Sequence, residues 1–212
     1  MEATTPPRIF WGDLSLPVAE ASLAALASDE IARAERLKHP LARARFVAGR
    51  VFLRSVLAAH IGSTPGDLRF VYAADGKPSL ENAVLHFNLA HSDHHAVLAL
   101  AAYPVGVDVE RIREPGTLWA MTPTVFTPSE QTELSAISEE RKIFAFFRLW
   151  TCKEALMKAL GGGFKLAQHI SITDYSTDAP VLIGLRDGDP TEWTLQVLPA
   201  PAGYAAALAY KK

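Results

Sequence analysis

The chain has 212 residues, of which 49% are hydrophobic and 21% charged, so it can fold as one good-sized domain or two small ones with a shared core. Its 21 basic and 23 acidic residues leave a net charge of −2, which argues against general nucleic-acid binding. The single cysteine, Cys152, excludes an internal disulfide and a cysteine zinc cluster. We expect a cytoplasmic protein without a membrane span, because no signal-type segment and no apolar run of 18 residues occur.

The first part of the chain predicts helices followed by strands. A short apolar run at residues 9–11 predicts a strand, and residues 19–36 predict helix, with Ser28 or Asp29 capping a second piece. Residues 43–61 predict a long, largely buried helix that ends at Gly62. Three strands are then predicted, at residues 68–72, 85–89 and 95–102, with a loop at residues 73–78.

The second part predicts a similar order of elements. A strand at residues 105–110 precedes a helix within residues 123–137, capped at Thr127 or Ser129, and a helix at residues 139–160 that three glycines end. Four more strands are predicted, at residues 170–173, 181–185, 193–198 and 203–210. The order suggests a duplicated α+β unit that divides near residue 103, although no residue-level repeat is convincing.

Asp108 and Glu110 are candidate metal ligands. They are two residues apart on a predicted strand, so both carboxylates point to one face, while Val107 and Val109 point to the other. Two converging carboxylates repel each other unless a cation or a proton lies between them, and hard oxygen ligands suit Mg²⁺ or Mn²⁺. A solvated strand edge explains the pair equally well.

Glu154 and Lys158 stand one turn apart on a predicted helix. An ordinary surface ion pair is the simple interpretation, but apolar residues flank the pair and the triglycine that follows would let a ligand approach the backbone. His91 is either a turn residue or a donor to phosphate. Arg33, Arg45 and Lys77 are likewise solvated charges or, if they converge, phosphate-binding groups.

Four motifs in order resemble one enzyme family. Gly106-Val107-Asp108-Val109-Glu110 and, forty residues later, Trp150-Thr151-Cys152-Lys153-Glu154-Ala155-Leu156-Met157-Lys158 resemble the paired signature of the 4′-phosphopantetheinyl transferases. Phe87-Asn88-Leu89-Ala90-His91-Ser92 is similar to the upstream motif of the longer, surfactin-synthetase-activating type, and Gly76-Lys77-Pro78 precedes it at the expected distance. The resemblance covers residues 33–163.

The resemblance implies an α+β fold of two similar halves in a pseudo-twofold arrangement, with the active site in the cleft between them. Residues 1–103 would contact the 3′-phosphate and adenine end of coenzyme A, and residues 104–212 would carry the metal and the catalytic residues. A chain of this length resembles the self-contained, monomeric members. No nucleic-acid or membrane partner is expected.

The implied reaction transfers the 4′-phosphopantetheine group of coenzyme A to a serine of an acyl or peptidyl carrier protein and releases adenosine 3′,5′-bisphosphate. Asp108, Glu110 and Glu154 would hold Mg²⁺, or Mn²⁺, against the pyrophosphate. Glu154 would also be the general base, and Lys158 would steady the pyrophosphate and the leaving group. The implied coenzyme A contacts are Arg33, Arg45, Lys77, Pro78, His91, Lys153 and Lys158.

Two residues depart from the family pattern: Ala90 stands where many members have serine, and Phe46 stands where some members have a smaller polar residue. Two other functions remain open from the residues alone. One is another divalent-metal enzyme, such as a phosphodiesterase or nuclease. The other is a non-catalytic carrier-binding module, against which the presence of all four of Asp108, Glu110, Glu154 and Lys158 argues.

Overall fold

The computed structural model describes residues 5–73, 76–81, 85–114 and 116–212. The first half of the chain forms β1 (Arg8–Asp13), α1 (Glu20–Leu23), α2 (Ser28–Arg36), α3 (Pro40–Ile61), β2 (Phe70–Tyr72), β3 (Pro78–Leu80), β4 (His86–Ser92) and β5 (His95–Ala101). The second half forms β6 (Val105–Arg111), α4 (Thr122–Val125), α5 (Pro128–Ala136), α6 (Glu139–Leu160), β7 (Ile170–Thr173), β8 (Val181–Leu185), β9 (Trp193–Val197) and β10 (Tyr204–Lys211).

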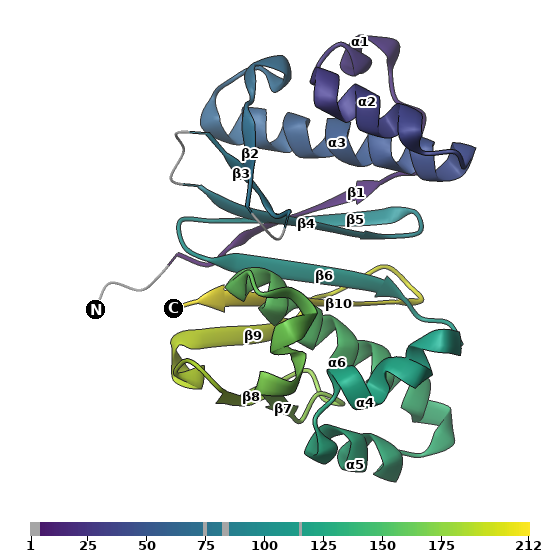
Figure 1. Ribbon diagram of the computed structural model, residues 1–212, viewed down its shortest axis with the longest axis vertical. Helices are drawn as coiled ribbons and strands as arrows, with labels where there is room; N and C mark the ends of the chain where they lie inside the picture. Colours follow the sequence, from purple (N-terminus) through teal and green to yellow (C-terminus); the bar gives the residue numbers. More distant parts are fainter. Residues whose placement is uncertain (1–4, 74–75, 82–84, 115) are drawn as a thin grey trace.

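The two halves repeat one arrangement. The first contains an antiparallel sheet in the order β1-β5-β4, and the second a sheet in the equivalent order β6-β10-β9 (Figure 1). Each sheet has its own 22-residue helix, α3 or α6, and each helix ends at a glycine in the left-handed conformation, Gly62 or Gly161. A two-stranded ribbon, β2-β3 or β7-β8, follows each helix. The α+β prediction is confirmed, and this order supports the predicted duplication.

The repeat extends to a buried ion pair in each half. Glu30 caps α2 by accepting from the backbone N–H of Ala27 at 2.8 Å, and it accepts from Arg54 Nε at 2.7 Å. Glu130 caps α5 in the same way, accepting from Thr127 N at 2.7 Å and from Lys153 Nζ at 2.6 Å. Both glutamates are at the N3 position of a nine-residue helix and are almost fully buried. Each pair therefore fixes a short helix against the long helix of its own half.

The two sheets meet along an apolar layer between β4-β5 and β6-β10. Its buried side chains are Ala90, Val97, Ala99, Ala101, Val105, Val107, Val109, Ala206 and Leu208. In addition, β4 lies along β6 and contacts it through side chains: Val107 N donates to Asn88 Oδ1 at 2.8 Å, and Arg111 N donates to Ser92 Oγ at 3.1 Å. The first half therefore contacts the strand that carries Asp108 and Glu110.

Gly106 allows α6 to lie directly on β6. Because side chains alternate along a strand, the valines at 107 and 109 enter the apolar layer, whereas residues 106, 108 and 110 face α6. A Cβ atom built on Gly106 would lie 2.1 Å from the carbonyl oxygen of Ala155 and 2.4 Å from the amide nitrogen of Ala159. The glycine in the GVDVE motif is thus explained by close helix–strand packing.

We expect Gly106→Ala to destabilise the protein by about 1–3 kcal/mol, because the added methyl group must push α6 off β6. Urea denaturation measures the free energy of unfolding. Gly49→Ala in α3 is the matched control: a Cβ there meets nothing within 4 Å, so alanine in the helix should be neutral or stabilising. Equal stability of Gly106→Ala and wild type would contradict the proposed packing constraint.

Most predicted elements are found with shifted ends. The long helix begins at Pro40 rather than at residue 43, since proline fits the first turn of a helix. Strand β4 extends through His91 and Ser92. Pro78, predicted as loop, begins β3, and residues 74–75 of that loop lie outside the described residues. None of the helices in the described residues combines the length and apolarity needed to cross a bilayer.

Candidate active site

Asp108 and Glu110 on β6 face Glu154 and Lys158 on α6. Glu154 and Lys158 share one helix face, and Lys158 Nζ donates to Asp108 Oδ1 at 2.6 Å. Asp108 is buried, whereas Glu110 is half-buried and accepts from Ser92 Oγ at 2.8 Å. The simple interpretation of Glu154 and Lys158 as a surface ion pair is therefore wrong, because Lys158 pairs with Asp108 across the two elements.

The three carboxylates influence one another electrostatically. Burial raises the pKa of Asp108, and burial together with the charge of Asp108 raises the pKa of Glu110. Burial also raises the pKa of Glu154 to about 7, with Asp108 and Glu110 adding to the effect and Lys158 opposing it. Three acidic groups thus share one region, in which Lys158 is the cation paired with Asp108. A further positive charge would stabilise their ionised forms.

One carboxylate oxygen of Asp108 has no hydrogen-bond partner among the described residues. This oxygen, Oδ2, is buried, whereas Oδ1 accepts from Lys158. As the side chains stand, no three His, Cys, Asp or Glu residues among those described form a group that could hold a metal ion. The unpartnered oxygen, the hard oxygen donors and the surplus of negative charge nevertheless fit a divalent cation, provided that the side chains converge when it binds.

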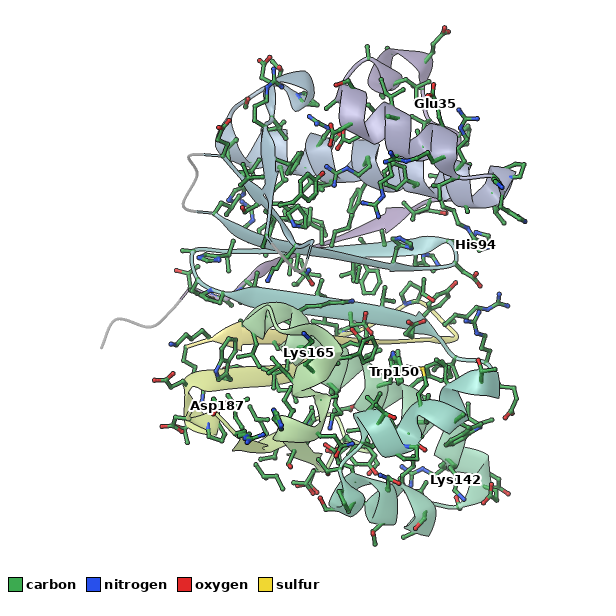
Figure 2. The ribbon with its side chains drawn as sticks, viewed as in Figure 1. Glu35, His94, Lys142, Trp150, Lys165 and Asp187 are labelled. Atoms are coloured by element: carbon green, nitrogen blue, oxygen red, sulfur yellow. The ribbon has the colours of Figure 1, made fainter. Side chains whose placement is uncertain are left out.

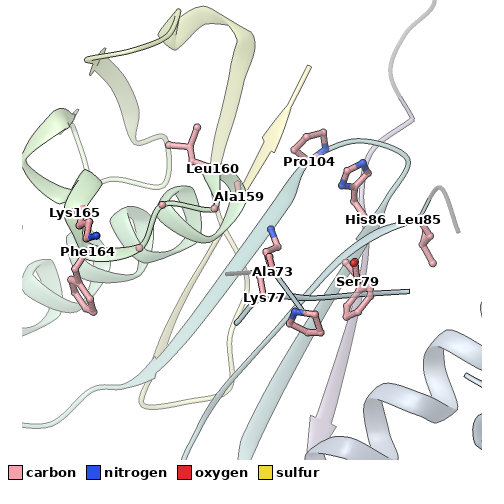
Figure 3. Close-up of a pocket in the computed structure, with 15 residues that line it drawn as sticks. Ala73, Lys77, Ser79, Leu85, His86, Pro104, Ala159, Leu160, Phe164 and Lys165 are labelled. Atoms are coloured by element: carbon pink, nitrogen blue, oxygen red, sulfur yellow. The ribbon is translucent and has the colours of Figure 1, made fainter. Parts of the chain in front are cut away.

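Residues of both halves line the cavity beside this cluster. The cavity has a volume of about 270 Å³, and its lining includes Lys77, Pro78 and Asn88 from the first half and Glu154 and Lys158 from the second. Lys77, Pro78, Gly163 and Phe164 also line a larger cavity of about 950 Å³ (Figure 3). Of the three acids, Glu154 therefore lines a groove that continues past the end of α6.

Three predicted coenzyme A contacts lie near the cluster. Lys77 Nζ donates to the backbone carbonyls of Lys158 and Val105, so it joins β6 and α6 at this end of the groove. Pro78 lines the same cavity as Glu154. Desolvation, followed by the positive charges of Lys158 and Arg45, lowers the pKa of His91, although the residue as a whole is exposed.

Arg45 and Arg33 lie farther toward the helices of the first half. Arg45 contacts Asp93 Oδ1 at 3.3 Å, and Asp93 Oδ2 accepts from Arg111 at 2.6 Å at the β4–β5 turn, beside His94 (Figure 2). The exposed Arg33 lies with its guanidinium 5.3 Å from the centre of the Phe46 ring, so this departure from the family pattern supports a basic side chain. Neither arginine lines the cavity that contains Glu154.

Lys153 is not brought to the groove. It is fully buried, and its Nζ donates to Glu130 and, at 2.9 Å, to the carbonyl oxygen of Ile170. Because adjacent helix residues point about 100° apart, Glu154 can face the groove while Lys153 enters the core. The prediction that Lys153 contacts coenzyme A does not agree with this geometry, and its contacts are those of a structural residue.

Two polar residues with contacts to the site were not singled out from the sequence. Asn88 and Ser92 contact the strand of Asp108 and Glu110, but both lie on the neighbouring strand of the other half. Their spacing of four on one strand places them on one face, together with Ala90. That spacing and their place in the motif at residues 87–92 are signals in the sequence, but neither indicates which strand the two residues contact.

Carboxylates that can hold a divalent cation, together with a lysine, are groups that phosphoryl-transfer enzymes use to neutralise charge. Comparison with known proteins agrees: residues 104–209 match the family model of the 4′-phosphopantetheinyl transferase superfamily. The chain belongs to this superfamily and is a transferase of that class.

Three relatives illustrate the similarity. The chain is 41% identical over 155 residues to the 4′-phosphopantetheinyl transferase HetI of Nostoc sp., a match that spans 70% of this chain and 65% of HetI. It is 31% identical over 197 residues to the putative 4′-phosphopantetheinyl transferase slr0495 of Synechocystis sp., spanning 91% of this chain and 80% of the relative. Identity to the transferase Sfp of Bacillus subtilis is 28% over 156 residues, or 73% of this chain and 69% of Sfp.

Proposed function

We propose that this chain transfers the 4′-phosphopantetheine group of coenzyme A to a serine of an acyl or peptidyl carrier protein, releasing adenosine 3′,5′-bisphosphate. The observation that carries the proposal is the meeting of Asp108, Glu110 and Glu154 with Lys158 beside a groove lined by both halves. Family membership supports the same reaction. Lys77 and Lys158 line the groove, and their positive charges suit a ligand with several phosphates.

Asp108, Glu110 and Glu154 are the proposed ligands of Mg²⁺, with Mn²⁺ as a substitute. The metal, when bound, would neutralise charge on the diphosphate and align it for attack. Lys158 would bind the diphosphate and the leaving phosphate, since its ammonium already lies at the cluster. Asp108 would hold Lys158 in that position.

The proposed coenzyme A contacts are Lys77, Pro78 and His91, with Arg45 and Arg33 at the 3′-phosphate end. Lys77 and Pro78 line the groove, and the charge of Arg45 acts on His91. Lys153 is not included among these contacts, because its ammonium group is buried and donates to Glu130. Lys77, Pro78 and Lys158 line one cavity with Glu154, which supports placing the diphosphate of the ligand there.

Glu154 is the proposed general base for the attacking serine. Burial and the neighbouring acids raise its pKa to about 7, near the pH at which a base is most useful in catalysis. Glu154 would accept the serine proton as the hydroxyl oxygen attacks phosphorus, while the leaving phosphate stays bound to Lys158. Coordination to a metal would lower this pKa, so alignment would then matter more than basicity.

We also propose a cytoplasmic monomer composed of two units, residues 1–103 and 104–212. The repeated order of elements supports this division. Because both units line one groove, a single chain supplies every residue named above. Sedimentation of the purified chain at micromolar concentration would test the monomer, and a concentration-dependent dimer would contradict it.

Incubation with coenzyme A, Mg²⁺ and a purified apo-carrier protein tests the proposed reaction. Intact mass spectrometry should show the carrier gaining one phosphopantetheine group, together with release of adenosine 3′,5′-bisphosphate. Hydrolysis of nucleotides without modification of a carrier would favour a phosphodiesterase-type enzyme instead. Binding of the carrier without either reaction would favour a non-catalytic binding module.

The same assay with a panel of fatty-acid, polyketide and nonribosomal-peptide carriers would identify the class of carrier that the enzyme modifies.

Metal binding should depend on pH. Without metal, the folded state holds a proton on Glu154 up to about pH 7, whereas an ordinary glutamate loses it near 4.5. Stability of the metal-free protein should therefore fall as pH rises through this window, because the folded state binds the extra proton. Apparent Mg²⁺ affinity should rise over the same window and then level off. Calorimetric titrations with Mg²⁺ from pH 5.5 to 8.5 measure the affinity. A Mg²⁺ affinity that does not change with pH would contradict the role of Glu154 as a metal ligand.

A further inference from the structure

Strand β4 uses a buried serine to hold a carboxylate of the acidic cluster. Ser92 is 8% exposed, and its hydroxyl makes two contacts with β6. Oγ donates to Glu110 Oε2 at 2.8 Å and accepts from the backbone N–H of Arg111 at 3.1 Å. A hydroxyl has one proton, so the Arg111 contact leaves that proton for Glu110. One oxygen of Glu110 is thus fixed, and Oε1 is the oxygen that can turn toward the other acids.

A second side chain of β4 fixes the same strand at its other end. Asn88 is also buried, and its Oδ1 accepts from the backbone N–H of Val107 at 2.8 Å. The Asn88 and Ser92 contacts enclose the segment that carries Asp108 and Glu110. On its other side β6 is paired with β10 through the backbone. The strand with the two carboxylates is therefore held along both edges, and the edge facing the first half is held by side chains.

We propose that Ser92 is a positioning residue for Glu110, and that Ser92 and Asn88 make β4 the support that orients the β6 carboxylates for a divalent metal. This inference rests on the proposed function, because it assigns Glu110 to the metal. Hydrogen-bonded partners of a ligating carboxylate fix its orientation, and their loss commonly weakens metal binding by about 10–100-fold. The first half of the chain thereby contributes to the metal centre without supplying a ligand.

The test compares Mg²⁺ binding by Ser92 variants. Mg²⁺ is titrated by calorimetry into the full chain saturated with coenzyme A. We expect Ser92→Ala to weaken Mg²⁺ binding by about 10–100-fold, while binding of coenzyme A without metal stays unchanged. Ser92→Cys keeps a weak donor of similar size, so its Mg²⁺ affinity should lie between those of Ser92→Ala and wild type. If Ser92→Ala does not fold, the Cys variant carries the test.

A double-mutant cycle separates positioning from general destabilisation. If Ser92 acts through Glu110, Ser92→Ala should change Mg²⁺ affinity little when Glu110→Gln is already present. Thr127→Ala is the matched control, because it removes another buried hydroxyl that accepts a backbone N–H, at the start of α5. That variant should lose stability but keep its Mg²⁺ affinity.

Two results would overturn the inference, and they are distinguishable from failure of the proposed function. Equal Mg²⁺ affinity in wild type and Ser92→Ala would remove the positioning role, as would full additivity of the Ser92 and Glu110 effects. If the wild type itself bound no Mg²⁺ in the presence of coenzyme A, the proposed metal centre would fail, and this inference with it.

Discussion

Glu154→Gln is expected to lower the turnover number of phosphopantetheine transfer by roughly 10²–10⁴-fold, which is the usual contribution of a general base. Glutamine keeps the shape of the side chain but cannot accept the serine proton, and it is a poorer metal ligand than a carboxylate. Coenzyme A binding should be largely retained, since Lys158 and Lys77 remain in place. Quench-flow measurement of carrier modification gives the rate of the chemical step.

Glu140→Gln is the matched control for this prediction, because Glu140 lies exposed in the first turn of the same helix. It should transfer phosphopantetheine at the wild-type rate. Thermal unfolding of Glu154→Gln should be measured below pH 6, where the Glu154 carboxyl is protonated without metal and the neutral glutamine should leave the unfolding temperature near that of the wild type. Unchanged turnover in Glu154→Gln would refute its role as the base.

Glu130→Ala is expected to reduce the free energy of unfolding by about 3–5 kcal/mol, the usual loss when one partner of a buried ion pair is removed. Glu130 accepts from Lys153 Nζ, from Thr127 N and, at 2.9 Å, from Ile172 N. Its removal leaves the fully buried Lys153 ammonium without its counter-ion. Because domains are stable by only about 5–15 kcal/mol, this loss is a large part of the total.

Chemical denaturation of Glu130→Ala and Glu133→Ala measures the difference. Glu133 lies on the same helix but is only half-buried, with one long contact to Thr173 Oγ1 at 3.4 Å, so its replacement should cost under about 1 kcal/mol. The double variant Glu130→Met, Lys153→Met should recover much of the lost stability, because apolar residues can replace a buried pair. If that double variant folds but no longer binds coenzyme A, the structural assignment of Lys153 is wrong.

The sequence was sufficient to predict most elements and the shared face of Asp108 and Glu110. The capping residue Thr127 and the glycines after each long helix mark ends that local chemistry decides. Asp108 and Glu110 share a face because side chains alternate along any strand. These features depend on neighbours in the chain, and so they could be predicted without knowledge of the fold.

Contacts between distant segments could not be predicted in this way. Arg50 and Arg54 form a stripe on the helical wheel, but the sequence does not show that both pair with Glu30. Lys153 and Glu154 belong to one motif, yet the helix turns one into the core and the other toward the groove. Ser92 contacts Glu110 only because the two halves place β4 beside β6. In each case the partner is set by tertiary packing.

The proposed metal centre consists of three carboxylates, from β6 and α6, around one cation beside the diphosphate of coenzyme A. A crystal structure of the chain with coenzyme A and Mn²⁺ tests it, because the anomalous signal locates manganese directly. We expect one manganese peak bound by Asp108, Glu110 and Glu154, with a diphosphate oxygen completing the site and Lys158 on the phosphates. A diphosphate bound elsewhere, or manganese away from these three side chains, would contradict the proposed metal centre.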